Sequence, residues 1–288
     1  MRRTSAVAIV GMLLAVLPLA PSNAVSGGTI VYDDNLVGRG LFTASPDMTN
    51  RTHLAGTTGA SDPAWSPDGT GVAYLQGLVI KWSDADGSNQ HILIGQHAFR
   101  KAWTETEILD FDWSPDGTQL VVCARPWTGG HGRTYVVTVA TREFTWISRG
   151  GGWVSWSSTD LIVLSRNGNL VTIKPDGSGR TRIVGDGLST APSWSPDGSK
   201  IAFQRVAGPD TYDINVVNAD GSGRVNLTKS VQVDWRPTWS PDGTQIMWSR
   251  ARWEEAFGDL FVMQADGSGA VRLTTTNKID EFNSDWKP

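Results

Sequence analysis

Five tryptophans and two arginines have the chemistry of ligand recognition, because flat aromatic rings and guanidinium groups are the usual anchors of binding sites. The set comprises Trp103, Trp127, Trp153, Trp235, Arg236, Arg252 and Trp253. Such rings suit sugars and peptide side chains equally. The alternative is that they fill gaps between packed elements. We interpret the set as a ligand-binding surface.

A second polar group precedes the tryptophans that recur along the chain. It comprises Asp62, Asp110, Asp112, Asp234, Arg236, Asp280, Glu281 and Asn283. Carboxylates gathered at the mouth of a channel suit a hard cation such as calcium. The same residues would equally cap strand ends or pair with Arg236. A metal therefore stays an open alternative, and no cofactor is predicted.

Catalytic motifs do not occur in the sequence. It contains no Gly-x-Ser-x-Gly elbow, no His-Glu-x-x-His helix and no phosphate-binding loop. Of the four histidines, His53 and His91 fall in predicted strands, and His97 and His131 fall in predicted loops. The sequence favours a binding protein over an enzyme. The alternative is a polysaccharide lyase or hydrolase acting at the channel mouth.

A repeat positions all of these residues. Trp-Ser-Pro-Asp-Gly occurs at 65–69, 113–117, 194–198 and 239–243, with a degenerate copy at 156–160 and a last tryptophan at Trp286. Asp-Gly-Ser recurs between these copies at 86–88, 176–178, 220–222 and 266–268. The six tryptophans stand about 38 to 48 residues apart, a period typical of one propeller blade.

Both motifs are turn sequences between strands. Pro presets the second position of a turn, and Asp and Gly adopt the conformations that follow, so each motif reverses the chain. Each unit then has four strands, A to D. Residues 29–32, 40–44 and 51–55 match strands B, C and D, and residues 282–286 match a missing strand A. The sequence predicts an all-β, six-bladed propeller of four-stranded blades, closed by pairing these fragments.

The two faces of such a propeller differ in their loops. The Ser-Pro-Asp-Gly and Asp-Gly-Ser turns join A to B and C to D on one uniform face. Longer connections are predicted on the opposite face, at 97–109, 125–134, 205–212 and 250–258. Binding residues concentrate in variable loops on a rigid scaffold. We therefore expect the ligand site on this variable face.

The repeat resembles a known family. The pattern Trp-Ser-Pro-Asp-Gly, then Ile-Ala-Phe, then Asn-Ala-Asp-Gly-Ser-Gly and Leu-Thr is similar to the TolB-type (PD40) repeat, and it differs from the WD-type repeat. The resemblance covers residues 29–288. It implies a docking platform for other proteins outside the cytoplasm. Oligogalacturonate lyases are also similar, and for them the resemblance implies metal and histidine in the channel.

The first 24 residues have the features of a secretory signal peptide. Arg2 and Arg3 precede an apolar run over 6–20, and Ser22-Asn23-Ala24 forms a small-residue cleavage site. The apolar run is about 22 Å long as a helix, shorter than a hydrocarbon core of about 30 Å. We expect cleavage after Ala24, no membrane insertion afterwards, and a propeller over residues 25–288, secreted or periplasmic.

Charge and cysteine content narrow the partners. The formal charge is −4, and this mild acidity does not favour nucleic acid. The one cysteine, Cys123, forms no disulfide within the chain, and its apolar neighbours predict a buried, inert thiol. The expected partner is an envelope or extracellular protein, a peptide or a glycan, bound by a monomer.

Overall fold

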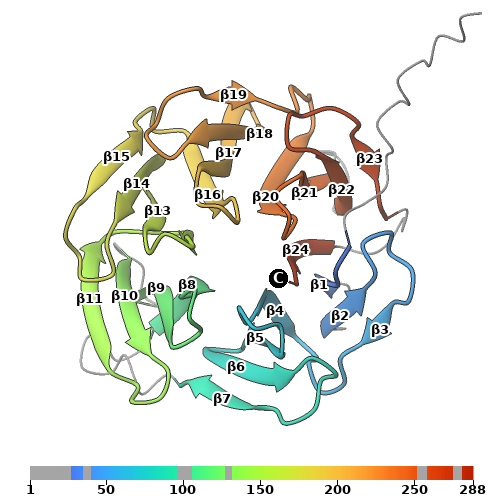
Figure 1. Cartoon of the computed structure of the whole chain (residues 1–288), viewed down its shortest axis with the longest axis vertical. Coiled ribbons are helices and arrows are strands. Elements are labelled where there is room, and N and C mark those ends of the chain that lie inside the picture. Colours follow the sequence, from blue (N-terminus) through green and yellow to red (C-terminus); the bar gives the residue numbers. More distant parts are fainter. Residues whose placement is uncertain are drawn as a thin grey trace, which may run out of the picture.

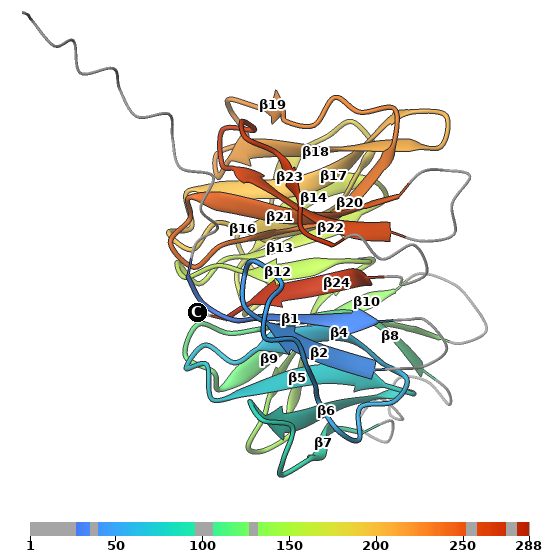
Figure 2. The same ribbon diagram turned by 90° about the vertical axis from the view of Figure 1, so that its right-hand side faces the viewer.

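The computed structural model describes residues 27–34, 40–95, 106–126, 132–251, 258–274 and 281–287. They form a ring of antiparallel sheets around a central axis (Figure 1). From the side, the strands run between the two faces of the ring (Figure 2). The all-β propeller predicted from the repeat is confirmed. In these ranges, no helix is long and apolar enough to cross a membrane.

Four sheets contain four strands each. The first combines β24 (Glu281–Trp286), β1 (Ile30–Asp34), β2 (Gly40–Ala44) and β3 (Thr52–His53). The second contains β4 (Ala60–Trp65), β5 (Gly71–Gln76), β6 (Val79–Asp84) and β7 (His91–Ile94). The third contains β8 (Thr106–Trp113), β9 (Gln119–Pro126), β10 (Arg133–Thr138) and β11 (Phe144–Arg149). The fourth contains β12 (Val154–Trp156), β13 (Ile162–Arg166), β14 (Asn169–Ile173) and β15 (Thr181–Val184).

The remaining eight strands form one continuous sheet, which differs from the predicted six separate blades. Its strands are β16 (Ser189–Trp194), β17 (Lys200–Gly208), β18 (Thr211–Asn218), β19 (Val225–Asn226), β20 (Val233–Trp239), β21 (Gln245–Ala251), β22 (Gly258–Gln264) and β23 (Val271–Arg272). The two halves join because Tyr212 in β18 pairs in parallel with Val233 in β20.

The first and last of the described strands meet in the first sheet. Strand β24 pairs antiparallel with β1, with Trp286 opposite Ile30 and Ser284 opposite Tyr32. This is the pairing that the sequence suggested for residues 282–286 and 29–32. Because β1 lies between β24 and β2, its backbone groups have partners on both sides.

The Ser-Pro-Asp-Gly turns share one geometry. In the turn 195–198, the amide of Gly198 donates to the carbonyl of Ser195 at 2.8 Å. The Ser195 hydroxyl donates to Oδ1 of Asp197 at 2.6 Å, and the Ser199 amide donates to the same oxygen at 3.0 Å. Gly198 has φ of +69°, the left-handed conformation predicted for it. The aspartates of these turns therefore act in folding.

The core lies between neighbouring sheets, where each repeat tryptophan is buried. Trp113, for example, packs with Ala73 and Ile80 of the preceding sheet. Cys123 is buried in β9, as predicted, and burial raises the pKa of its thiol to about 12. The repeat tryptophans thus join successive sheets into one ring.

One predicted loop is wrong. Residues 205–212 were expected to form a long connection, but β17 and β18 continue through them, with Val206 opposite Tyr212. The hairpin closes at Pro209-Asp210, where Asp210 has φ of +55°. Proline followed by a left-handed residue is the pattern of a type II turn, so strands on either side extend fully.

Candidate functional site

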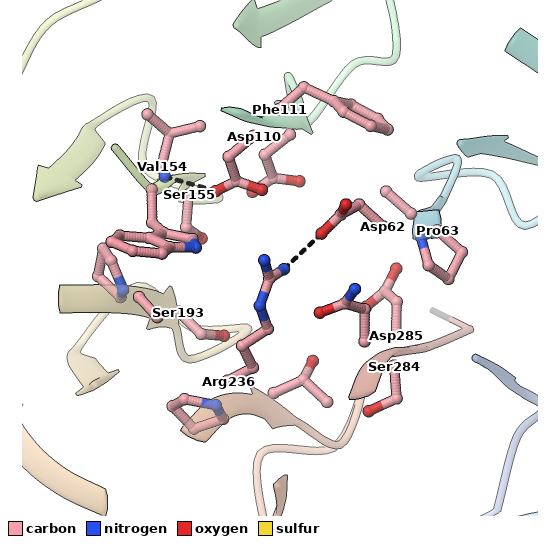
Figure 3. A pocket seen from close by; sticks show the side chains of 18 residues that line it. Asp62, Pro63, Asp110, Phe111, Val154, Ser155, Ser193, Arg236, Ser284 and Asp285 are labelled. Atoms are coloured by element: carbon pink, nitrogen blue, oxygen red, sulfur yellow. Dashed lines mark hydrogen bonds and ion pairs between the residues drawn. The ribbon is translucent and has the colours of Figure 1, made fainter. Parts of the chain in front are cut away.

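The first strands of the sheets surround a central cavity of about 140 Å³ (Figure 3). Two rings of side chains line it, defined by their distance from each repeat tryptophan. The upper ring lies three residues before and comprises Asp62, Asp110, Trp153, Ala191, Arg236 and Asn283. The lower ring lies one residue before and comprises Ala64, Asp112, Ser155, Ser193, Thr238 and Asp285.

Bulges present part of the upper ring to the cavity. Asp62, Ala191 and Arg236 have φ between +46° and +51°, a conformation that non-glycine residues rarely adopt. Each precedes a proline, and the register of its strand shifts there. Backbone strain of this kind clusters at functional sites, which singles out this part of the ring.

A charge network crosses the upper ring. Arg236 extends through the cavity to Asp62, with which it forms an ion pair and a hydrogen bond (Figure 3). The Asp62 amide donates to Oδ2 of Asp33 at 3.2 Å, and the side-chain amide of Asn283 donates to the same oxygen at 2.6 Å. Oδ2 of Asp110 accepts the amide of Val154 at 2.8 Å.

The lower ring ties neighbouring sheets together. Oδ2 of Asp112 accepts the backbone amide of Trp156 at 2.7 Å, and Oδ2 of Asp285 accepts that of Trp65 at 2.7 Å. Ser155 accepts the amide of Trp194 at 3.2 Å in the same way. Each bond runs from one sheet to the repeat tryptophan of the next. The lower ring therefore has a structural role, because its hydrogen bonds connect neighbouring sheets around the channel.

Burial within the channel raises the pKa of four carboxyl groups. The pKa is about 8 for Asp110, about 7 for Asp285, and about 6 for Asp33 and Asp112. Arg236 opposes the shift at Asp110, whereas the Asp62 charge adds to it. Burial lowers the pKa of Arg236, but the Asp62 and Asp110 charges outweigh this effect and raise it. At neutral pH Asp110 is mainly protonated, so it can donate a hydrogen bond.

Among the seven recognition residues predicted from the sequence, Trp153 and Arg236 line the cavity. Trp235 is half-buried and does not line it, because it precedes the bulge at Arg236. The other four, Trp103, Trp127, Arg252 and Trp253, lie outside the described residues, as do His97 and His131.

The predicted channel group is partly correct. Asp62, Asp110, Asp112, Arg236 and Asn283 line the cavity as expected.

Asp234 does not line the cavity, which corrects its prediction. It is fully buried, its two oxygens pair with Arg250, and Oδ1 also accepts the indole N–H of Trp248 at 3.0 Å. The register of β20 shifts between Trp235 and Thr238, so Asp234 does not share the face of Arg236 despite the spacing of two residues. Asp280 lies outside the described residues, and the side chain of Glu281 is not described.

Sequence reasoning missed Asp33 and Asp285. Asp285 precedes Trp286 as Asp112 precedes Trp113, so the repeat held a signal for it. A proline follows Asp62, Ala191 and Arg236, and it could have predicted the bulges in these strands. Asp33 had none, because it reaches the network from β1 through Asp62 and Asn283.

The channel carboxylates that the structure describes are not arranged as a metal site. Among the residues that the structure describes, no three His, Cys, Asp or Glu side chains are arranged to hold a metal ion. The hydrogen bonds explain this result, since the oxygens of Asp112 and Asp285 accept backbone amides. The calcium alternative finds no support in this part of the chain.

Comparison with known proteins agrees with the propeller fold. The family model of the TolB beta propeller domain (PD40) matches residues 165–288. Over these residues the chain is similar to the TolB propeller family. Among curated proteins, the comparison found no match.

Solved structures extend the likeness around the ring. TolB from Acinetobacter baumannii is 18% identical with a TM-score of 0.76, over 91% of this chain and 67% of that one. A chain of the nidogen/laminin complex is 12% identical with a TM-score of 0.68, over 91% and 99%. An oligogalacturonate lyase in complex with manganese is 16% identical with a TM-score of 0.56, over 81% and 70%. At these identities the likeness shows the propeller fold alone.

Proposed function

We propose that this TolB-like propeller is an extracytoplasmic binding module that docks a protein, peptide or glycan at its variable face, over the channel. One observation carries the proposal. Trp153 and Arg236, two residues singled out for recognition, share one cavity with carboxyl groups of raised pKa. Perturbed carboxyl groups in a concave site are characteristic of functional sites.

The cavity suits a polar ligand. Arg236 and Asp62 supply charges of opposite sign, and the largely protonated Asp110 supplies a hydrogen-bond donor. Trp153 also lines the cavity and adds a flat apolar surface. A few fixed polar groups beside an aromatic ring orient a ligand group and select it by its hydrogen bonds.

The structural likenesses support a macromolecular partner. The nidogen/laminin structure is by its description a complex of proteins, and its propeller aligns with 91% of this chain. Residues 165–288 are similar to the TolB propeller family, and TolB itself has the same fold. We propose an envelope or extracellular protein as the first partner to test, with a peptide or glycan as the other two.

Substitution of one tryptophan inside the cavity and one outside it tests the site. Trp153 lines the cavity, whereas Trp146 is 57% exposed on the outer strand β11. Replacing a true anchor costs about 2 kcal/mol of binding, so Trp153→Ala should weaken capture at least about tenfold. Trp146→Ala is the matched control and should bind normally. Trp127→Ala and Trp253→Ala are expected to act like Trp153→Ala.

The measurement is ligand capture from a native envelope extract and on a glycan array, followed by the Kd of the captured ligand for each variant. Thermal melting shows whether each variant is folded. Normal binding by folded Trp153→Ala, or equal loss in Trp146→Ala, would overturn the proposed site.

Catalysis on a polysaccharide is the alternative function. It rests on the fold shared with oligogalacturonate lyase and on the carboxyl groups of the channel. A lyase or hydrolase would increase the number of polysaccharide chain ends with time, whereas a binding module would retain the polymer intact. Incubation with array polysaccharides separates the two functions.

The proposed function requires that the protein is exported from the cytoplasm. We propose export through residues 1–24 as a signal peptide, so that the propeller of 25–288 works as a monomer in the periplasm or the medium. Mass spectrometry of the exported protein should find Val25 at its N-terminus. Recovery of membrane-bound chain that begins at Met1 would contradict it.

The number of four-stranded repeats in the ring depends on how the eight-stranded sheet is divided. We propose that the eight-stranded sheet represents two repeats, β16 to β19 and β20 to β23, which gives six in the ring. Each half begins with a strand that ends in a repeat tryptophan, Trp194 or Trp239. A single parallel residue pair joins the halves.

A further inference from the structure

A second pocket lies on the opposite face, between two of the Ser-Pro-Asp-Gly turns. Its volume is about 320 Å³. Trp82 and Trp113 form aromatic walls, Pro67 and Pro115 come from the two turns, and Asp68 and Asp116 line it as carboxylates. The indole rings of Trp82 and Trp113 meet edge to face, with centroids 5.9 Å apart. We refer to these six residues as the turn pocket.

The turn pocket depends on a pair of residues that other repeats lack. Trp82 lies opposite Ala73 in β5, and the residues at the corresponding pairs of other sheets are Val136, Val216 and Val262. A Cβ on Gly71 would lie 2.2 Å from Cζ2 of Trp82. The corresponding residues six positions after Trp113, Trp194 and Trp239 are Gln119, Lys200 and Gln245. In the second sheet, the indole of Trp82 therefore occupies the space that a side chain at position 71 would need.

The equivalent place between the first and second sheets already contains a lysine side chain. Lys287 follows β24, and its Nζ lies 5.2 Å from the ring centroid of Trp65. Its Cε lies 2.6 Å from the position of a Cβ on Gly69, so the alkyl chain rests against the turn. Trp65 and Gly69 correspond in the repeat to Trp113 and Gly117 of the turn pocket. An ammonium over the ring of a repeat tryptophan is therefore already present in this fold.

The turn pocket has the charges to hold a second ammonium. In both Asp68 and Asp116, Oδ1 accepts the bonds that close the turn, and Oδ2 takes no part in them. The hydroxyls of Ser66 and Ser114 lower the pKa of these two carboxyl groups, so both are ionised at neutral pH. An aromatic wall with two carboxylates attracts a cation with an apolar stem.

We propose that the turn pocket binds a lysine side chain of a partner protein, with its ammonium against Trp82, Trp113 and the two carboxylates. The pocket lies on the turn face, away from the central cavity, so this site is independent of the proposed ligand site there. It gives the protein a second docking point.

The test uses the full chain and two small probes. Nα-acetyl-lysine N-methylamide carries the ammonium, and Nα-acetyl-norleucine N-methylamide has the same straight alkyl chain without it. The indole N–H signals of Trp82 and Trp113 are followed by NMR. We expect saturable shifts with the lysine probe and binding about fivefold weaker with the norleucine probe. Equal affinity for both probes, or no saturable shift, would overturn the proposal.

Charge-removing variants locate the ammonium. Asp116→Asn keeps an oxygen at Oδ1 for the turn and removes the negative charge, so the fold should persist. We expect it to weaken lysine binding about threefold or more. Asp197→Asn makes the same change in an equivalent turn outside the pocket and should have no effect. Trp82→Val, which introduces the residue found at Val136, Val216 and Val262 of other sheets, should abolish the shift of Trp113. Unchanged binding by Asp116→Asn contradicts the site even where Trp82→Val does not fold.

Discussion

Aspartates in two regions of this propeller have opposite acidity. On the turn face, Asp68, Asp116 and Asp197 accept a serine hydroxyl and further turn bonds, which lower their pKa. In the channel, burial raises the pKa of Asp110 to about 8 and that of Asp285 to about 7. The side chain is the same, and its surroundings decide which form is stable.

The difference separates residues that build the fold from residues that can change state. The turn aspartates repeat with the blades, and each stabilises its own hairpin. The upper channel ring does not repeat, since it holds aspartate, tryptophan, alanine, arginine and asparagine at equivalent positions. Irregularity within a regular scaffold, combined with raised pKa, is the reason for proposing the ligand site at the channel.

The largest effect is expected from removing the cation of the upper ring. Arg236→Gln leaves Asp62, Asp110 and Asp33 without their compensating charge. The pair is partly buried, with the Arg236 side chain 30% exposed, so breaking it should cost about 2 kcal/mol of unfolding free energy, between the values for exposed and fully buried pairs. The loss should be largest at pH 8 and smaller at pH 5, where Asp33 and Asp110 are protonated. Chemical denaturation at both pH values measures it.

Arg224→Gln is the matched control. Arg224 pairs with Asp186 at the surface, and its side chain is 43% exposed. Such pairs contribute about 0.5 kcal/mol or less. Equal losses for the two variants, or a loss for Arg236→Gln that does not depend on pH, would remove the distinction between channel and surface.

The next effect is the pH dependence of stability. The folded pKa of Asp110 is about 8, above its ordinary value of 3.8, so between these values the folded state binds more protons than the unfolded state. Stability should therefore fall as the pH rises from about 4 to about 8. Asp110→Asn should flatten this fall and stabilise the protein at pH 8 by about 1 kcal/mol or more.

Asp197→Asn provides the comparison on the turn face. Its pKa lies below the ordinary value, so it stays ionised between pH 5 and 8 and its replacement should leave the slope unchanged. Unfolding curves recorded between pH 5 and 8 for both variants measure the slope of stability against pH. Asp285, Asp33 and Asp112 keep part of the slope in either case, so a slope that is no smaller in Asp110→Asn than in the unsubstituted protein would show that the Asp110 carboxyl group does not titrate as described.

The smallest effect separates backbone conformation from packing within the turns. Gly198 and Gly243 both have φ of +69°. A Cβ on Gly198 would lie 2.8 Å from Cγ2 of Thr159, whereas on Gly243 it would lie 3.6 Å from Cδ of Pro196. Gly198→Ala should cost about 1 kcal/mol or more and Gly243→Ala less, as measured by denaturation. Intact stability with lost ligand binding in Gly198→Ala would contradict the proposed ligand site at the channel and place that site on the turn face instead.

Much of the fold could be predicted because its determinants are local. The turns at 65–69 or 195–198 follow from a few adjacent residues, and their spacing implies the ring. The cavity wall was harder to predict, since a bulge such as that at Asp62 shifts the alternation of a strand. Asp234, five residues before Trp239, was predicted to line the channel and is buried with Arg250 instead. Tertiary contacts of this kind, and the approach of Asp33 from another strand, leave no pattern in the sequence.

The most direct test is an NMR titration of the aspartate side-chain carboxyl carbons between pH 2 and 9. The account predicts apparent pKa values of about 8 for Asp110, about 7 for Asp285 and about 6 for Asp33 and Asp112. Asp68, Asp116 and Asp197 should titrate below 3.8 in the same spectra. Channel and turn aspartates that titrate together near pH 4 would contradict the division between the two regions.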